Sequence, residues 1–169
     1  DNLNFDFIYH EHMSYYTISS FIEISKKYNY TIDNIELIDV HGGSIRVHLK
    51  HYNNLFYINP NLSHLLDNEK NIEQDIKTLY DNMYSWKQQI LEILNKEKNK
   101  NNVIYGYGAS GRTNTILSFI NFNFDYIFDD SKYKINNYIP YYHTKIYNSK
   151  EIYTISDIKT IFILAWPYS

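Results

Sequence analysis

Three short segments of the chain contain side chains that could do chemistry. The first is Tyr9-His10-Glu11-His12, in which four titratable groups stand in a row. A neighbouring carboxylate can orient an imidazole and raise its pKa, so that the ring can serve as a general base. Two histidines at i and i+2 are a weak metal pattern, and the chain has no cysteine to complete a zinc site. The alternative interpretation is an exposed polar turn.

The second segment is His41-Gly42-Gly43-Ser44-Ile45-Arg46. Backbone amides at a glycine-rich turn, a hydroxyl group and a guanidinium group could together cradle an oxyanion. Two successive glycines would serve an ordinary β-hairpin turn equally well. The segment therefore predicts a turn and leaves open whether the turn binds a ligand.

The third segment is Gly106-Tyr107-Gly108-Ala109-Ser110-Gly111, a G-x-G-x-x-G pattern. It follows an expected strand and opens an expected helix, and Asp129 and Asp130 end the next strand. This context is typical of a dinucleotide-binding loop, in which helix N-terminal amides face an anion. Arg112 would add a charged fork for phosphate. The pattern favours a nicotinamide or flavin enzyme, although nucleotide-sugar proteins share such loops.

The composition supports a special role for the second and third segments. All five glycines fall in them, and the only two arginines fall in the second (Arg46) or directly follow the third (Arg112), whereas residues with AT-rich codons are abundant everywhere else. Glycine is needed where φ is positive or where another group approaches the backbone closely. Arginine provides a bidentate fork for phosphate or carboxylate that lysine cannot copy. The alternative is that two turns simply require glycine.

Length and composition exclude several classes of protein. The 169 residues suffice for one domain or two small ones, and 44% of them are hydrophobic, as in a globular protein. A net charge of −3 gives no basic field for nucleic acid, and the absence of cysteine excludes disulfides and thiol chemistry. No apolar run approaches the roughly 20 residues that cross a membrane. We therefore expect a cytoplasmic protein. Because the chain begins with Asp1, we also expect it to be a piece of a longer protein.

Hydrophobic spacing predicts the elements of the first hundred residues. We expect a helix from Thr17 or Ser19 to Tyr28, then an antiparallel pair of strands over 32–40 and 45–49. Residues 52–66 are expected to be irregular, and 67–99 to form one long helix. Its apolar stripe predicts a core face or a surface that joins two lobes: Ile72, Ile76, Leu79, Met83, Trp86, Ile90 and Ile93.

The last third alternates strands and helices. Strands are expected at 103–105, 124–128 and 160–166, with an extended piece at 144–147 and a helical turn at 149–153. The helix at 113–122 links the first two strands into a βαβ unit, so the sheet should be parallel. The fold class is therefore α/β, with a Rossmann-like C-terminal lobe after a long helix and a β-hairpin. We divide the chain into 1–66, 67–100 and 101–169.

Five segments in this order resemble the sugar C-methyltransferase family. They are Tyr9-His10-Glu11-His12-Met13-Ser14-Tyr15, His41-Gly42-Gly43-Ser44-Ile45-Arg46-Val47, Gly106-Tyr107-Gly108-Ala109-Ser110, Asn114-Thr115 and Leu164-Ala165-Trp166. The resemblance covers the end of the catalytic domain and the C-terminal domain. These enzymes use S-adenosylmethionine to methylate a carbon of a nucleotide-linked keto-sugar. The resemblance implies that residues 1–66 are part of the catalytic domain, and that an upstream domain binds the methyl donor.

The resemblance also implies residue roles. His12 matches the general base that removes the proton α to the sugar ketone, giving an enolate that attacks the donor methyl, and Glu11 and Tyr9 match its neighbours. Because Glu11 and His12 would point to opposite faces of a strand, a turn is expected here. The implied substrate-binding residues are His41, Gly42, Gly43, Ser44, Arg46, Gly106, Gly108, Ala109, Ser110, Arg112, Asn114, Asp129, Tyr133 and Lys134.

The sequence departs from the family at several positions. Arg112-Thr113 stands where the family has Lys and Gly, and Asp130 and Lys132 where it has Arg and Pro. Two alternatives therefore stay open beside the methyltransferase. One is a nicotinamide-dependent oxidoreductase that uses Gly106–Gly111 and Asp129. The other is a non-catalytic nucleotide-sugar-binding or assembly module with the Ile72–Ile93 stripe exposed to a partner.

Overall fold

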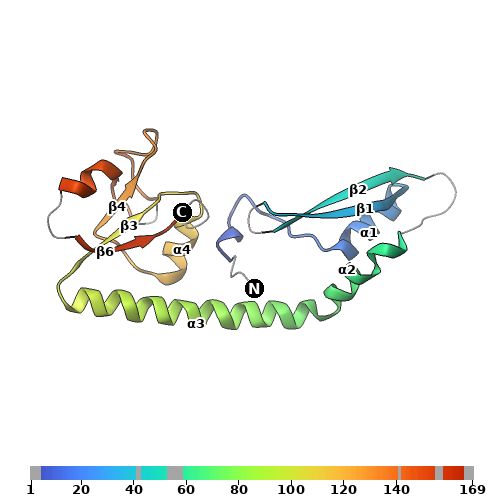
Figure 1. The fold of residues 1–169 in the computed structure, drawn as a ribbon, viewed down its shortest axis with the longest axis horizontal. Coiled ribbons are helices and arrows are strands. Elements are labelled where there is room, and N and C mark those ends of the chain that lie inside the picture. Colours follow the sequence, from blue (N-terminus) through green and yellow to red (C-terminus); the bar gives the residue numbers. More distant parts are fainter. Residues whose placement is uncertain (1–4, 41–42, 53–58, 141, 155–157, 166–169) are drawn as a thin grey trace. The chain divides into compact units, whose positions relative to one another are not determined.

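A computed structural model describes residues 5–40, 43–52, 59–140, 142–154 and 158–165 (Figure 1). The chain divides into two compact units. The N-terminal unit contains His12–Tyr80, and the C-terminal unit contains Leu3–Glu11 and Asp81–Ser169. Each unit combines helices with a β-sheet. The expected α/β class is therefore confirmed.

A helix and an antiparallel pair of strands begin the N-terminal unit. Helix α1 (Ile18–Lys27) starts where the Thr17 hydroxyl accepts a hydrogen bond from the backbone amide of Ser20, at 3.1 Å. This is the N-cap contact that the sequence predicts. Strands β1 (Tyr30–Ile38) and β2 (Ser44–His51) then pair antiparallel, with a register shift between Ile32 and Asn34.

The segment before the long helix differs from the expectation. Residues predicted to be irregular contain a 3-10 turn, η2 (Pro60–Leu62), and a short helix, α2 (Ser63–Asn68). A second 3-10 turn, η3 (Glu69–Asn71), separates α2 from helix α3 (Ile72–Asn99), so the predicted single helix over 67–99 is wrong at its start. The reason is tertiary: Leu62 and Leu65 are buried in the core of this unit.

Helix α3 buries part of the predicted stripe, namely Trp86 and Ile90, and leaves other members of it exposed. Leu94 is fully buried in the core of the C-terminal unit, and Trp86, Ile90 and Leu91 pack against that core. Ile76 and Ile93, which the stripe included, are 61% and 55% exposed. The helix is therefore only partly a core element, and its first turns carry exposed apolar side chains.

The C-terminal unit is built on a parallel sheet. Its strands are β3 (Val103–Tyr107), β4 (Tyr126–Asp129), β5 (Ile146–Asn148) and β6 (Ile158–Ile163), in the order β5-β4-β3-β6. All three strand pairs are parallel, as predicted. Helix α4 (Thr113–Ile120) connects β3 to β4 and contributes Ile116, Leu117 and Ile120 to the core. A six-residue 3-10 helix, η4 (Ser149–Thr154), follows β5.

The strand order creates a topological switch point. After β3 the chain adds β4 and β5 on one side, and β6 then returns to the other side of β3. Ligands of open α/β sheets bind at the carboxyl ends of the strands at such a point. The carboxyl ends of β3, β4 and β6 are therefore the place where this sheet would hold a ligand.

Asparagine occupies most of the left-handed backbone positions that are described. Asn29, Asn101, Asn121 and Asn136 have φ between 54° and 67°. The first three follow or cap α1, α3 and α4, where glycine is the usual residue.

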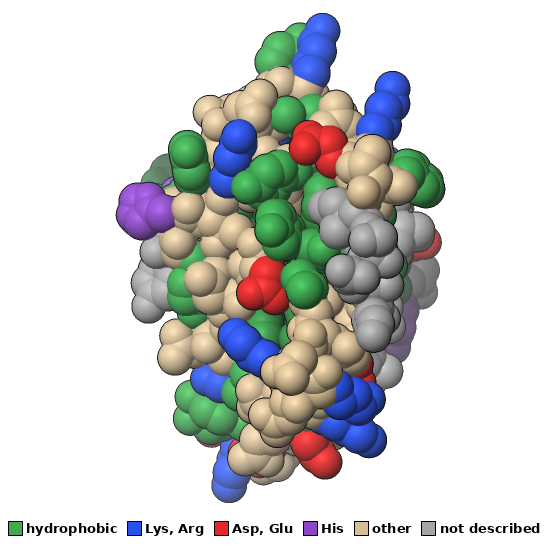
Figure 2. Space-filling view, turned by 90° about the vertical axis from the view of Figure 1, so that its left-hand side faces the viewer, with side chains coloured by type: hydrophobic (Ala, Val, Ile, Leu, Met, Phe, Trp, Pro, Cys, Tyr) green, Lys and Arg blue, Asp and Glu red, His purple; other side chains and the backbone are tan. Residues whose placement is uncertain are grey.

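Figure 2 shows positive and negative side chains interspersed on one face of the molecule. Among the described residues, no helix is long and apolar enough to cross a membrane.

Candidate functional site

The Tyr9–His12 segment forms a turn, as predicted, and the division between the units falls within it. Residues 9–11 have bend and turn geometry, and Glu11 and His12 belong to different units. The Tyr9 hydroxyl lies 3.5 Å from Glu11 Oε2, and His10 Nε2 lies 4.0 Å from Glu11 Oε1. Tyr9, His10 and Glu11 therefore form one exposed polar group in the C-terminal unit.

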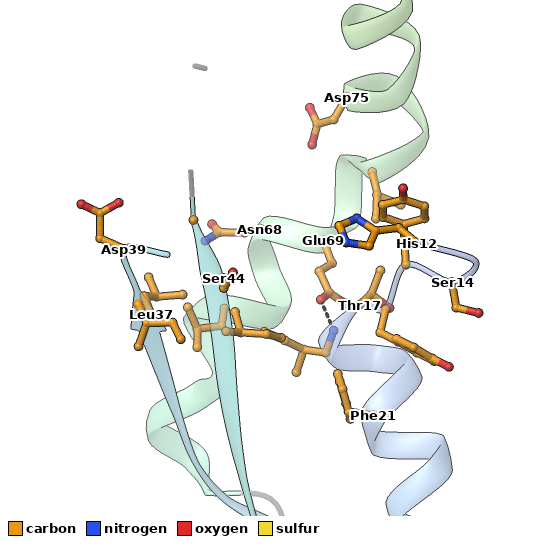
Figure 3. A pocket seen from close by; sticks show the side chains of 18 residues that line it. His12, Ser14, Thr17, Phe21, Leu37, Asp39, Ser44, Asn68, Glu69 and Asp75 are labelled. Atoms are coloured by element: carbon orange, nitrogen blue, oxygen red, sulfur yellow. Dashed lines mark hydrogen bonds between the residues drawn. The ribbon is translucent and has the colours of Figure 1, made fainter. Parts of the chain in front are cut away.

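His12 lines a pocket of about 1100 Å³ in the N-terminal unit, and His10 is not among its lining residues (Figure 3). The walls come from the segment after His12, from the β1–β2 hairpin and from the start of α3, with Ser44, Glu69 and Asp75 as polar members. The His12 ring lies edge-on to Tyr15, with 6.4 Å between ring centroids. An imidazole at the wall of an open pocket is placed where a general base can meet a ligand.

Glu69 brings a carboxylate to the same pocket. It accepts hydrogen bonds from the backbone amides of Ile18 and Ser19 and from the Ser19 hydroxyl, the last at 2.6 Å. Burial raises the pKa of Glu69, but these hydrogen bonds outweigh it and leave that pKa below its ordinary value. Glu69 therefore carries a negative charge at neutral pH and ties η3 to the N-terminus of α1.

The glycine turn contributes only part of its predicted residues to this pocket. Gly43 and Ser44 line it, and the Ser44 hydroxyl donates to the Val40 carbonyl at 2.9 Å. Arg46 is not among the lining residues: it pairs with Glu36 at 2.9 Å on the strand face opposite to Ile45. His41 and Gly42 lie outside the described residues.

Backbone amides of the Gly106–Gly111 loop donate hydrogen bonds to acceptors within the protein. The amide of Gly108 donates to the Phe128 carbonyl at 2.8 Å, and that of Ala109 to Asp129 Oδ2 at 2.7 Å. The amide of Ser110 donates to the Thr113 hydroxyl at 2.9 Å, which in turn donates to the Gly108 carbonyl. Three of the amides that a phosphate cradle would use therefore already have acceptors.

Asp129 is an internal acceptor rather than a free acid. The residue is 7% exposed, and its carboxylate accepts from the Ser131 amide at 2.8 Å as well as from the Ala109 amide. Lys134 Nζ lies 3.2 Å from the same carboxylate. Tyr133, another predicted binding residue, is 80% exposed. Asp129 and Lys134 thus fix the loop after β4 to the glycine loop.

Arg112 is buried against the segment that precedes Tyr9–His12. Its Nη1 atom lies 3.3 Å from Asp6 Oδ2, and its guanidinium group lies 4.3 Å from the centre of the Phe7 ring. Arg112 is 7% exposed and Asp6 2% exposed. The side chain that the sequence proposed for a phosphate therefore meets a carboxylate of the protein. Asn114 is half-buried in α4, and its Oδ1 atom has no hydrogen-bond partner among the described residues.

A second, smaller pocket lies at the carboxyl ends of β3, β4 and β6. It has a volume of about 310 Å³; its lining includes the predicted binding residues Ser110, Asp129 and Lys134, and also Tyr107 and Asp130, which were not predicted. Asp130 accepts hydrogen bonds from the Tyr107 and Ser149 hydroxyls. The hydrogen bonds from Ser149 and Tyr107 hold the pKa of Asp130 below its ordinary value. In the sequence, only the adjacent acids Asp129 and Asp130 at a strand end pointed to Asp130, and the prediction named Asp129, which is the buried one.

The same contact alters Tyr107. The hydrogen bond to Asp130, burial and nearby carboxylate charge raise the pKa of Tyr107 to about 12. We expect Asp130→Asn to return this pKa toward 10 and Asp81→Asn, on α3, to leave it unchanged, as measured by NMR titration of the ¹³Cζ resonance. Because the folded-state pKa is the higher one, this contact stabilises the fold below about pH 10 and is lost as the pH rises toward 12. A Tyr107 pKa that is unchanged in Asp130→Asn would contradict the assignment.

No group of three or more His, Asp or Glu that could hold a metal ion occurs among the described residues.

Comparison with known proteins identifies the family. No curated protein sequence matches the chain. The model of the C-methyltransferase C-terminal domain matches residues 39–169, which leaves His12 outside the matched range and includes the glycine turn, α3 and the whole parallel sheet. The chain therefore belongs to the C-methyltransferase C-terminal domain family.

Proposed function

We propose that this chain forms part of a C-methyltransferase that uses S-adenosylmethionine to methylate a carbon of a nucleotide-linked keto-sugar. Family membership supports the reaction class. The observation that carries the finer proposal is the position of His12 at the wall of the larger pocket. The Tyr9–His12 motif before the matched domain resembles the catalytic segment of sugar C-methyltransferases.

His12 is the proposed general base. Methylation at carbon requires a carbanion equivalent, which forms when a proton is removed next to a carbonyl group. The C–H electron pair then becomes the enolate double bond, the carbonyl oxygen takes the negative charge, and the proton moves to the imidazole. Imidazole suits this step because its ordinary pKa is close to neutral pH. Ser44 and Glu69 would contact the sugar hydroxyls in the same pocket.

The described residues do not fit the methyl donor. The only G-x-G-x-x-G loop of the chain has its Gly108, Ala109 and Ser110 amides bonded internally. Asp129, the acid that would bind a ribose in such a fold, is bonded to that loop. We therefore assign no residue of this chain to S-adenosylmethionine and expect a further domain to bind it. The same contacts weaken the nicotinamide-dependent alternative.

Hydrogen exchange at the substrate tests the base without a methyl donor. A base that forms the enolate also exchanges the α-proton with solvent. In D₂O, we expect the chain to accelerate deuterium uptake next to the ketone of a nucleotide-linked keto-sugar. The His12→Ala variant should lose about 100-fold or more of this rate, as is usual for a general base. Mass spectrometry of the recovered sugar measures the uptake.

His10→Ala is the matched control, since His10 is two residues away and outside the pocket. We expect it to keep the exchange rate. Equal loss in both variants, or no exchange above the uncatalysed rate, would refute the role of His12. Because no donor site is assigned here, the chain alone should transfer no methyl group from labelled S-adenosylmethionine; turnover would overturn that assignment.

A further inference from the structure

We infer that the smaller pocket, at the carboxyl ends of β3, β4 and β6, is a hydroxyl-recognition site centred on Asp130 that binds neighbouring hydroxyl groups of a sugar ring and excludes phosphate. The inference rests on the proposed function for the class of ligand. It differs from the sequence-based expectation, in which Asp129, Arg112 and the loop amides would hold that ligand. Most donors at this pocket already have partners within the protein, whereas acceptors remain available.

The phosphate-binding groups of the loop are not available to a ligand. The amides of Gly108, Ala109 and Ser110 each have an acceptor within the C-terminal unit. Arg112 is 7% exposed and faces Asp6, and it does not line the pocket. Lys134 lines the pocket but lies 3.2 Å from the Asp129 carboxylate, which balances its charge. An anion entering this pocket would meet no uncompensated positive charge among the described lining residues.

Asp130 is left as the one carboxylate of the pair that faces solvent. Asp129 is 7% exposed, whereas Asp130 is exposed at the end of the same strand. Each oxygen of Asp130 accepts one hydrogen bond, from Tyr107 and from Ser149 respectively. A carboxylate has about four lone-pair sites, so each oxygen keeps one for a ligand. Two neighbouring hydroxyl groups on a sugar ring would match these two oxygens.

The two hydroxyl groups around Asp130 reinforce this selectivity. Because Tyr107 and Ser149 donate their protons to Asp130, they can only accept a hydrogen bond from a ligand. The raised pKa of Tyr107 is consistent with a phenol that keeps its proton on Asp130. Asp130 and Tyr107, which line the pocket, therefore offer acceptors alone at this point, and these suit hydroxyl donors and oppose phosphate oxygens. The position at the switch point of the sheet is where such a ligand is expected.

Four probes separate the chemical sources of the hydroxyl groups. UDP has a ribose diol, dTDP has a single ribose hydroxyl, dTDP-glucose has hexose diols, and inorganic diphosphate has none. Binding to the 169-residue chain is followed by the NMR shifts of the Ser110, Asp130 and Ser131 amides. We expect UDP or dTDP-glucose to shift these resonances, and dTDP and diphosphate to leave them in place. Binding of UDP alone identifies the nucleotide ribose, and binding of dTDP-glucose alone identifies the hexose.

Asp130→Asn should lower the affinity for whichever probe binds by about tenfold or more, because it replaces a charged acceptor by a neutral amide. Asp81→Asn, on an exposed part of α3, is the matched control and should keep the affinity. Tyr107→Phe retains the Asp130 charge and removes one acceptor, so it should bind several-fold more weakly. It carries the test if Asp130→Asn does not fold.

The outcomes that overturn the inference are distinct from failure of the proposed function. Equal binding of diphosphate or dTDP would show a phosphate site, and unchanged affinity in both Asp130→Asn and Tyr107→Phe would place the diol elsewhere. Absence of binding by all four probes would also overturn it. In each case, the His12-dependent deuterium exchange decides the proposed function independently, because His12 lines the other pocket.

Discussion

Replacing Arg112 by Met is expected to lower the free energy of unfolding of the C-terminal unit by about 3 kcal/mol or more. The substitution leaves the Asp6 carboxylate, which is 2% exposed, without the guanidinium that lies 3.3 Å away. Removing one partner of a buried ion pair leaves a desolvated charge uncompensated. Urea unfolding followed by Trp86 fluorescence measures the loss, since Trp86 contacts Phe5 of the same segment at 5.2 Å.

A double substitution separates the ion pair from simple packing. Asp6→Leu combined with Arg112→Met replaces both charges by apolar groups and should recover most of the stability lost by Arg112→Met. Lys100→Ala removes an exposed ion pair with Glu97 and should change little. If Arg112→Met were as stable as the wild type, or if the double variant were no better than the single one, the buried pair would not have the assigned role.

This ion pair also affects the position of the Tyr9–His12 segment. Phe5 lies between Trp86 and Phe119, with ring centroids 5.2 and 5.0 Å away, and Phe7 stacks on Arg112. The backbone then turns, since the amide of Tyr9 donates to the Phe7 carbonyl at 3.1 Å. The first residues of the motif are thus fixed to the start of α4. One of the two arginines of the chain therefore pairs with a carboxylate of the protein.

Gly108→Ala is the second substitution with a large expected effect. A Cβ atom at Gly108 would lie 2.4 Å from the Cβ of Ala165 and 3.1 Å from the Ala165 amide nitrogen. In addition, φ at Gly108 is +97°, which L side chains rarely adopt. Overpacking and backbone strain together should cost about 3 kcal/mol. Thermal or urea unfolding measures this cost. Loss of the hydrogen bond from the residue 108 amide to the Phe128 carbonyl would appear as faster hydrogen exchange of that amide.

The same loop offers a matched control. A Cβ atom at Gly111 would meet no atom within 4 Å, and its φ is not in the left-handed range. We therefore expect Gly111→Ala to be neutral or slightly stabilising, by up to about 1 kcal/mol. If Gly108→Ala and Gly111→Ala had the same effect, the close approach of Gly108 to Ala165 would not explain the need for glycine at that position.

Local signals predicted much of the fold. The Thr17 cap, the antiparallel strands and the strand-loop-helix-strand order at 103–129 all follow from hydrogen bonding or periodicity within a few residues. Strand β5 has only three residues, and the sequence predicted no more than an extended piece there. The break between α2 and α3 could not be predicted, because burial of Leu65 and the contact of Glu69 with α1 are long-range.

The site was less accessible to prediction for the same reason. His12 lines one pocket, and Ser110, Asp129 and Lys134 line another; the ligand-binding roles of these residues stay predictions. Which of two adjacent acids is buried depends on the direction of each side chain at the end of β4, and a pattern cannot state it. The Asp6–Arg112 pair joins residues far apart in sequence, and a glycine-rich loop next to arginine suggests phosphate until its partner is known.

The left-handed asparagines explain what the few glycines mean. Asparagine tolerates φ near +57°, so a chain with an AT-rich codon bias can end its helices with it and dispense with glycine there. Asparagine cannot substitute where φ reaches +97° or +120°, at Gly108 and Gly43, or where a Cβ would strike a neighbour, at Gly106 and Gly108. Gly43, Gly106 and Gly108 thus mark places where the backbone or a close neighbour excludes a side chain, whereas asparagine marks the ends of several helices.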